Sequence, residues 1–342
     1  MKLKRFVAAF FAVIALAAFS IRADGAEGAF KPTPAGSPPS KLREFQFTYH
    51  ADIPVTNQSA RKIEAWIPLP RDDAFQQVTD LKIDSPVPTR IVDQPVNGNR
   101  VAYLEASAPL PATIPVTVSF VVTRHEEAAD MVRAARPLPE PTDGAFAQYL
   151  GPNKLVPVDG RIAQISNNLS EQGITALEQA RVIYEYVTEV MSYDKSGTGW
   201  GHGDAVYACD IRRGNCTDFH SLFIGLARAR GIPARFTIGF PLAKAKSGTI
   251  PGYHCWAEFY SGGVWVPIDA SEAWKHPDRH AYYFGNLDAD RVAFTIGRDL
   301  VLDPKQNGEA LNYLIYPYVE VDGVAVPQKQ IVTKFSYADT AP

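Results

Sequence analysis

Three residues that together can perform thiol chemistry lie within one stretch of the chain, between positions 213 and 270. Cys216 offers a thiol that becomes a nucleophile once it is ionised. His254 can take up a proton and return it, because its unperturbed pKa lies near neutrality. Asp269 can fix the tautomer and orientation of the imidazole by accepting a hydrogen bond from it. We therefore expect a triad of these residues that attacks carbonyl groups, provided that the fold brings them together.

The segment after Cys216 has the pattern of a helix that begins at this residue. Apolar positions recur through TDFHSLFIGLARARG, and Gly231 and Pro233 mark the end of the helix. Free backbone N–H groups and the positive end of the helix dipole favour a thiolate at Cys216. The dipole contributes only about 0.3–1 kcal/mol, or ~2 kcal/mol when partly buried, against about 1.4 kcal/mol for each pKa unit. A cationic partner such as His254 must therefore supply most of the activation.

Two strands after this helix are expected to bring His254 and Asp269 together. The segments YHCWAEFY and VWVPIDA are joined by an SGG turn at 261–263. Counting outward from the turn places Asp269 within about two residues of the position opposite His254, where cross-strand side chains can form hydrogen bonds. Strand alternation points Cys255 to the face opposite His254.

Taken in order, these segments resemble the transglutaminase-like superfamily. The motifs are a Cys that opens a helix ending in a GIPAR-type turn (GNCTDFHSLFIGLARARGIPARF), an H-x-W-x-E strand (YHCWAEFY) and a W-x-x-x-D strand (VWVPIDA). The resemblance covers about residues 150–300 and implies a papain-like core, with Cys216 as nucleophile, His254 as base and Asp269 as the orienting residue. No calcium loop of the D-x-D-x-D-G type is present in the sequence, so the calcium dependence of animal relatives is not expected.

The resemblance implies acyl transfer or amide hydrolysis on peptide or protein substrates. The Cys216 thiolate would attack an amide or thioester carbonyl, its backbone N–H would bind the oxyanion, and His254 would protonate the leaving amine. The acyl-enzyme would pass to an amine, giving cross-links, or to water, giving deamidation or proteolysis; the sequence leaves this choice open. No cofactor or metal is expected. The alternative is a non-catalytic periplasmic binding or scaffold protein with a vestigial triad.

Other residues near these motifs have a structural and a functional interpretation. His220 lies on the same helical face as Cys216 and could line the site or bind a metal with Cys216 and His254. A zinc thiolate would block the nucleophile, which disfavours the metal. Asp218, in the first helical turn, is interpreted as a helix-capping residue. The glycine-rich stretch SGTGWGHG at 196–203 is interpreted as an ordinary surface loop, because it lacks the pattern of a phosphate-binding loop.

The chain has three cysteines, and an odd number in an exported protein leaves one thiol unpaired. We expect a Cys209–Cys255 disulfide that braces the site and leaves Cys216 free. Two reduced, buried thiols are the alternative.

The helices and strands that must position these residues are expected to form an α+β fold. An antiparallel β-sandwich is followed by a papain/transglutaminase-like core, in which the nucleophile helix packs on an antiparallel sheet. Alternating apolar residues and an Asn97-Gly98 turn favour the sandwich. Thr175 and Glu178 form a capping box before a helix with one apolar stripe. After Asp269, the segments GRDLVLDP at 297–304 and NYLIYPYVEV-DG-VAV, with its DG turn, are expected to be strands that extend the core sheet or cover its edge. The expected divisions are a sandwich at 41–125, a linker at 126–150, a transglutaminase-like domain at 151–320, and a C-terminal strand and tail at 321–342.

The N-terminal segment has the pattern of an export signal. Basic residues precede an apolar run from Phe6 to Ile21, which suits a signal peptide at 1–23, and residues 24–40 are rich in Pro, Gly, Ala and Ser, as in a flexible tether. Removing the signal leaves 30 basic and 37 acidic residues, a formal net charge of −7. We expect a periplasmic or secreted protein with no stable membrane span after cleavage and no nucleic-acid partner. The oligomeric state stays open.

Overall fold

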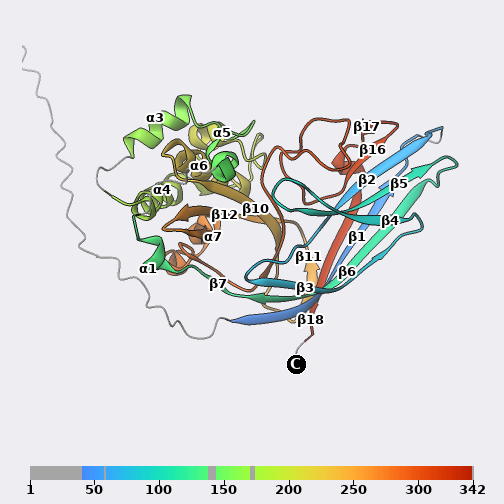
Figure 1. Cartoon of the computed structure of the whole chain (residues 1–342), viewed down its shortest axis with the longest axis horizontal. Helices are drawn as coiled ribbons and strands as arrows, with labels where there is room; N and C mark the ends of the chain where they lie inside the picture. Colours follow the sequence, from blue (N-terminus) through green and yellow to red (C-terminus); the bar gives the residue numbers. More distant parts are fainter. Residues whose placement is uncertain (1–40, 58, 138–143, 170–173, 341–342) are drawn as a thin grey trace, which may run out of the picture. The chain divides into compact units, whose positions relative to one another are not determined.

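The computed structural model describes residues 41–57, 59–137, 144–169 and 174–340. The predicted signal peptide and tether, at 1–23 and 24–40, lie outside the described residues. The described part is an α+β fold in which a β-sandwich is joined to a mainly antiparallel sheet covered by helices, as Figure 1 shows. The predicted fold class is confirmed.

Two antiparallel sheets form the sandwich, with strand orders β11-β18-β1-β6-β3 and β17-β16-β2-β5-β4. Side chains of β1 alternate between the core and the outer face, and Phe45, Phe47 and Tyr49 are buried. Asn97 and Gly98 have φ of 65° and 60° in the turn between β4 and β5, as a primed hairpin turn requires. The strands are β1 (Leu42–Pro54), β2 (Lys62–Leu69), β3 (Gln76–Asp84), β4 (Thr89–Asp93), β5 (Arg100–Ser107), β6 (Thr113–His125), β11 (Ser247–Ile250), β16 (Tyr318–Val321), β17 (Val324–Ala325) and β18 (Val332–Asp339).

The C-terminal strands belong to the sandwich, which corrects the prediction that they extend the core sheet or cover its edge. β16 pairs with β2, where Glu320 lies opposite Glu64, and β18 pairs with β1, where Tyr337 lies opposite Phe47. Residues 297–304, expected to be a strand, form only one isolated bridge, at Leu300. The edges of β1 and β2 need partners, and distant segments of the chain provide them, so the sandwich extends well beyond residue 125.

A third antiparallel sheet, which we call the core sheet, has the order β13-β12-β10-β15. Its strands are β10 (Ala234–Pro241), β12 (His254–Ser261), β13 (Val264–Ile268) and β15 (Arg291–Ile296). Helix α6 (Cys216–Ala229) packs on β12 and β10 (Figure 1). Leu222, Phe223 and Leu226 of α6 are fully buried, so the apolar face read from the sequence is the face that meets the sheet and the neighbouring helices.

Further helices surround α6. α4 begins at the predicted capping box, where the Thr175 side chain accepts from the Glu178 backbone N–H. The other short elements, which include most of the predicted linker, serve as connections. The helices are α1 (Met131–Ala134), α2 (Ala147–Leu150), α3 (Gly160–Asn168), α4 (Ala176–Val190), α5 (Ala205–Ile211) and α7 (Ala270–Lys275), and the short strands are β7 (Glu127–Ala128), β8 (Ser192–Tyr193), β9 (Arg213–Gly214) and β14 (Asn286–Leu287). Within the described residues, none of the helices has the length and apolar character needed to cross a membrane.

Buried side-chain amides connect the sandwich to the core sheet. Gln76 donates to the Ala293 carbonyl at 3.0 Å and accepts from the Ala293 N–H at 2.8 Å. Asn99 makes the same pair of hydrogen bonds to the backbone of Ile296, both at 2.8 Å. Both partners lie on β15, the edge strand of the core sheet. One glutamine and one asparagine side chain from the sandwich therefore satisfy backbone N–H and C=O groups on this open edge.

Candidate active site

Cys216 is the first residue of α6, as predicted. Asn215 caps the helix by accepting from the Thr217 N–H at 2.9 Å. The Cys216 side chain is only 2% exposed and lies at the helix end, where backbone N–H groups have no partners within the helix. The thiol is therefore placed beside the positive end of the dipole, which favours its ionised form.

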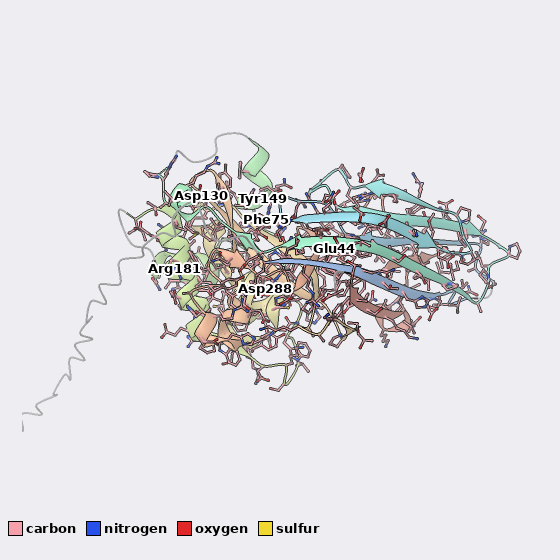
Figure 2. The ribbon with its side chains drawn as sticks, turned by 90° about the horizontal axis from the view of Figure 1, so that it is seen from below. Glu44, Phe75, Asp130, Tyr149, Arg181 and Asp288 are labelled. Atoms are coloured by element: carbon pink, nitrogen blue, oxygen red, sulfur yellow. The ribbon has the colours of Figure 1, made fainter. Side chains whose placement is uncertain are left out.

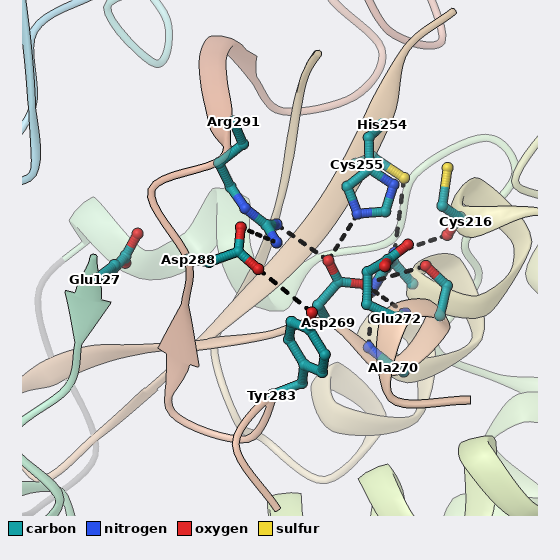
Figure 3. A network of polar contacts seen from close by, with 12 residues as sticks. Glu127, Cys216, His254, Cys255, Asp269, Ala270, Glu272, Tyr283, Asp288 and Arg291 are labelled. Atoms are coloured by element: carbon teal, nitrogen blue, oxygen red, sulfur yellow. Dashed lines mark hydrogen bonds and ion pairs between the residues drawn. The ribbon is translucent and has the colours of Figure 1, made fainter. Parts of the chain in front are cut away.

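His254 and Asp269 are directly hydrogen-bonded. His254 Nε2 lies 2.7 Å from Asp269 Oδ2, and both side chains are buried (Figure 3). The β12–β13 pairing places Ala257 opposite Ile268, so Asp269 follows at the strand end two residues short of the position facing His254. This confirms the register counted from the SGG turn. Because a carboxylate only accepts, Nε2 carries a proton, and Nδ1 is left for the Cys216 thiol.

Four donors hold Asp269. The hydroxyl of Ser271 and the N–H of Glu272 donate to Oδ1 at 3.1 and 3.0 Å, so Asp269 also caps α7. The Arg291 guanidinium donates to Oδ2 at 3.0 Å, the same oxygen that His254 engages (Figure 3). Asp269 is completely buried and fully hydrogen-bonded, so its charge is held in one place and its orientation is fixed before any substrate binds.

The charges of these groups are mutually stabilised. Burial opposes the charged form of His254, but Asp269 and Cys216 outweigh it and raise the His254 pKa to about 10. Burial also raises the Cys216 pKa, yet interactions with Cys255 and His254 hold it well below the usual thiol value. Despite burial, His254 and Arg291 keep the Asp269 pKa well below its ordinary value. Near neutral pH the cluster therefore contains a thiolate, an imidazolium and a carboxylate.

His220 is a structural neighbour of this cluster. Its Nδ1–H donates to the Cys216 carbonyl at 2.7 Å, and its Nε2 accepts from the Ala270 N–H at 3.1 Å. Burial lowers the His220 pKa, consistent with a neutral ring. Both nitrogens are used to join the start of α6 to the start of α7, and the neutral ring leaves no lone pair for the metal considered from the sequence.

The predicted Cys209–Cys255 disulfide is wrong, because all three cysteines are free and buried. Cys255 points to the face of the strand opposite His254, as predicted. Its sulfur faces α6 and lies 3.6 Å from His220 Nδ1. Cys209 lies on α5 with its sulfur near Asp210. Alternation predicted the direction of Cys255, but no sequence pattern indicated the direction of Cys209, which lies on a separate helix.

The glycine-rich segment 196–203 is a loop of mostly exposed residues, as interpreted from the sequence, and its last residues are bound to the start of α6. Asp218 Oδ2 accepts from the Gly201 N–H at 2.7 Å, and Oδ1 accepts from the Gly203 N–H at 3.0 Å. Asp218 also caps α6 as expected, through the Asn215 N–H at 2.9 Å. Arg298 donates to the Gly203 carbonyl and to Ser221 of α6. One buried carboxylate thus holds both the loop and the residue before Cys216.

Comparisons with known proteins agree with this geometry. Residues 163–270 match the model of the transglutaminase-like superfamily. This segment is a transglutaminase-like domain. It contains Cys216, His254 and Asp269, the three residues on which the sequence resemblance was based.

One relative in sequence and one solved structure match this chain beyond the transglutaminase-like domain. An uncharacterized protein of Haemophilus influenzae is 28% identical over 318 residues, which cover 82% of this chain and 86% of that protein. A crystal structure from Cytophaga hutchinsonii, described as a "Putative Cysteine Protease", matches with a TM-score of 0.61 and 17% identity over 88% of this chain and 94% of that chain. The sandwich and the core therefore recur together in one fold.

Arg291 lies outside the transglutaminase-like domain, 22 residues after the Asp269 that it contacts. No motif marks it. The one available signal is a charged residue at the start of RVAFTI, a strand whose residues are all buried. A buried arginine requires an anionic partner, and several acidic residues were available in the sequence.

Proposed function

We propose that this protein performs thiol-dependent acyl transfer or amide hydrolysis on peptide or protein substrates through Cys216, His254 and Asp269. The observation that carries the proposal is the buried 2.7 Å contact between His254 and Asp269, with the Cys216 thiol beside the imidazole at the start of α6. The transglutaminase-like domain supports the same chemistry, and a structural neighbour described as a cysteine protease is consistent with peptide substrates.

In this mechanism the Cys216 thiolate forms a bond to the substrate carbonyl carbon, and the carbonyl electrons move to oxygen. The Cys216 N–H, at the free end of α6, donates to that oxyanion. The C–N bond then breaks as the His254 imidazolium gives its proton to the leaving amine, leaving a thioester on Cys216. Neutral His254 next takes a proton from water or from an incoming amine as its oxygen or nitrogen forms a bond to the thioester carbonyl carbon. The C–S bond then breaks, which releases the acyl group as an acid or as a new amide and restores the Cys216 thiolate and the His254 imidazolium.

Alkylation tests the activated thiol. Iodoacetamide labelling from pH 5 to 9, with the modified residue identified by mass spectrometry, is expected to show Cys216 reacting at nearly its full rate below pH 7. A His254→Gln variant should shift that reactivity toward the pH of an ordinary thiol, about 8.5. If wild-type Cys216 reacts only as the pH nears 8.5, the thiol is not activated, and the alternative of a non-catalytic binding protein is preferred.

The acyl acceptor requires a second measurement. Incorporation of a fluorescent amine into a glutamine-rich protein supports transfer, while release of peptides without incorporation supports hydrolysis. Cys216→Ala serves as the blank for both assays. Activity that survives in this variant would contradict the proposed nucleophile.

We also propose that the protein acts outside the cytoplasm. The basic and apolar pattern of residues 1–23 supports export, since it suits a cleaved signal. Recovery of the mature chain from a periplasmic fraction or from the medium, with an N-terminus after residue 20, is the expected result. An uncleaved chain in the cytoplasm would contradict it.

A further inference from the structure

A cavity of about 270 Å³ lies between the sandwich and the core sheet. Phe75 and Arg124 contribute from the sandwich, and Trp256 and Glu258 from β12 of the core sheet. Figure 2 labels Phe75 where the long strands of the sandwich meet the rest of the structure. Cys255, between Trp256 and the catalytic candidate His254 in sequence, points the other way, toward α6. The cavity therefore lies behind the sheet, on the face away from α6.

Two arginines on the sandwich side of the cavity are incompletely neutralised. Arg124 is buried, with its side chain 1% exposed, yet its contacts to Asp73 and Glu127 are 3.4 and 3.1 Å, longer than a strong charge-assisted hydrogen bond. Among the described residues no carboxylate pairs with Arg71, whose Nη1 donates to the Asn97 carbonyl. The Nε–H groups of Arg71 and Arg124 are buried without a protein acceptor. A buried donor without an acceptor is costly, so this wall of the cavity favours an added anionic oxygen.

Three acidic residues, Asp73, Glu127 and Glu258, line the cavity together with Arg71, Arg124 and Arg235, and Asp73 lies 3.4 Å from Arg124. Glu258 is already committed to Arg235, with contacts of 2.9 and 2.6 Å. Burial and the charge of Glu258 raise the Glu127 pKa to about 7, against opposing effects of Arg124 and Arg235 and a further raising effect of Asp73. Glu127 is thus partly neutral at physiological pH, and an incoming anion would favour its protonated form further.

The remaining walls are aromatic and apolar. Phe75, Trp256 and Trp265 line the cavity with Val264 and Phe294. The volume is close to the lower limit of ordinary small-molecule sites, which begin near 300 Å³. The arginines, the aromatic walls and the volume together favour a small molecule with one carboxylate and an apolar body, about the size of an aromatic acid.

We propose that this cavity is a second, non-catalytic site that binds a small organic carboxylate, with Arg124 and Arg71 holding the carboxylate and the aromatic residues holding the apolar body. Trp256 connects this site to the candidate triad, because its ring lies 6.3 Å from the His254 ring and 5.1 Å from the Arg291 guanidinium. The proposal does not depend on the proposed enzymatic activity.

Calorimetric titration with benzoate, and with benzamide as its neutral match, tests the site. Benzoate is expected to bind and benzamide to bind about tenfold more weakly or not at all, because only the anion satisfies the arginines. Benzoate affinity should fall between pH 6 and 8 as Glu127 loses its proton. Cys216→Ala should bind benzoate as the wild type does, which separates this site from the thiol site and keeps the result independent of catalysis.

Variants identify the residues. Arg124→Gln and Arg71→Gln should each weaken benzoate binding about tenfold, while Arg100→Gln, which removes one positive charge elsewhere on the sandwich, should not. Arg71 is only half-buried, so its variant is expected to fold even if Arg124→Gln does not. Equal binding of benzamide and benzoate, loss of binding in Cys216→Ala, or unchanged binding in Arg71→Gln would each overturn the proposal.

Discussion

Asp269 shares one oxygen between two cations, and this arrangement sets the electrostatics of the candidate triad. His254 Nε2 and Arg291 Nη1 lie 2.7 and 3.0 Å from Oδ2. A lone buried carboxylate would pair very strongly with the imidazolium and make it a poor proton donor. Arg291 takes part of that negative charge, while Asp288, 3.4 Å from Arg291 Nη2, in turn balances the guanidinium. The carboxylate therefore orients His254 while it shares its negative charge with Arg291.

The substitution Arg291→Met tests whether Arg291 weakens the interaction between Asp269 and His254. Without the guanidinium, Asp269 interacts with His254 alone, so the His254 pKa is expected to rise above about 10 and the alkaline inflection of Cys216 alkylation to move upward. Peptide turnover should fall roughly 10- to 100-fold, as it does when partners that orient an active-site group are removed. Arg291→Lys keeps a charge and should return much of the shift. An unchanged alkaline inflection in Arg291→Met would show that Arg291 is only a packing residue.

At the scale of elements, the start of α6 and the glycine-rich segment form one unit. Gly197, Gly199, Gly201 and Gly203 have φ between 64° and 89°, a region that other residues rarely adopt. A Cβ on Gly203 would lie 2.7 Å from Ser221 Oγ, so the segment lies directly against α6. Asp218 accepts from this backbone and from Asn215 at the same time, so this one side chain joins the loop to the start of α6.

Asp218→Asn is expected to loosen this unit. An amide oxygen replaces only part of the charge-assisted acceptance, so amide exchange at Gly201 and Gly203 should accelerate and turnover should fall about tenfold or more. Stability should fall by roughly 1–3 kcal/mol. Glu178→Gln is the matched control, because Glu178 occupies the same capping-box position of α4, away from the site, and it should cost no more than about 1 kcal/mol with activity unchanged. Equal effects of the two substitutions on turnover would contradict a special role for Asp218.

The features that the sequence predicted correctly depend on neighbouring residues in the chain. The start of α6 at Cys216 and the register that joins His254 to Asp269 each follow from a cap or a turn within about 15 residues. The features that it missed depend on which distant segment of the chain pairs with a given strand edge or contacts a given buried charge. β18 completes the edge of β1, and Arg291 reaches Asp269 from another strand, although neither carries a pattern that names its partner. Alternation correctly predicted the direction of Cys255. Rejecting the Cys209–Cys255 disulfide would have required knowing how the helices pack on the sheet.

At the scale of the whole described structure, the sandwich and the core sheet enclose ionisable groups that neither would bury alone. Arg124 and Glu127 come from the end of β6 and from β7, while Arg235 and Glu258 come from β10 and β12. Within the described part of the chain, Glu127 has only Arg124 as a direct ionic partner, at 3.1 Å, and it lies near the charge of Glu258. Packing the sandwich against the core sheet therefore has a free-energy cost that is larger when Glu127 is charged.

This cost predicts how stability changes with pH. The Glu127 pKa is about 7 in the folded protein against about 4.3 in an unfolded chain, so the folded state retains a proton that the unfolded state has lost between these values. The contribution of Glu127 to stability is therefore fully present below about pH 4.3 and is lost as the pH rises through 7. Glu127→Gln resembles the protonated form at every pH. Its stability relative to the wild type should rise by up to roughly 3 kcal/mol between pH 4.5 and 8 in urea unfolding, because other titrating groups cancel in the difference. A difference that stays constant, or that falls with pH, would mean that the ion pair with Arg124 outweighs burial and that Glu127 remains charged.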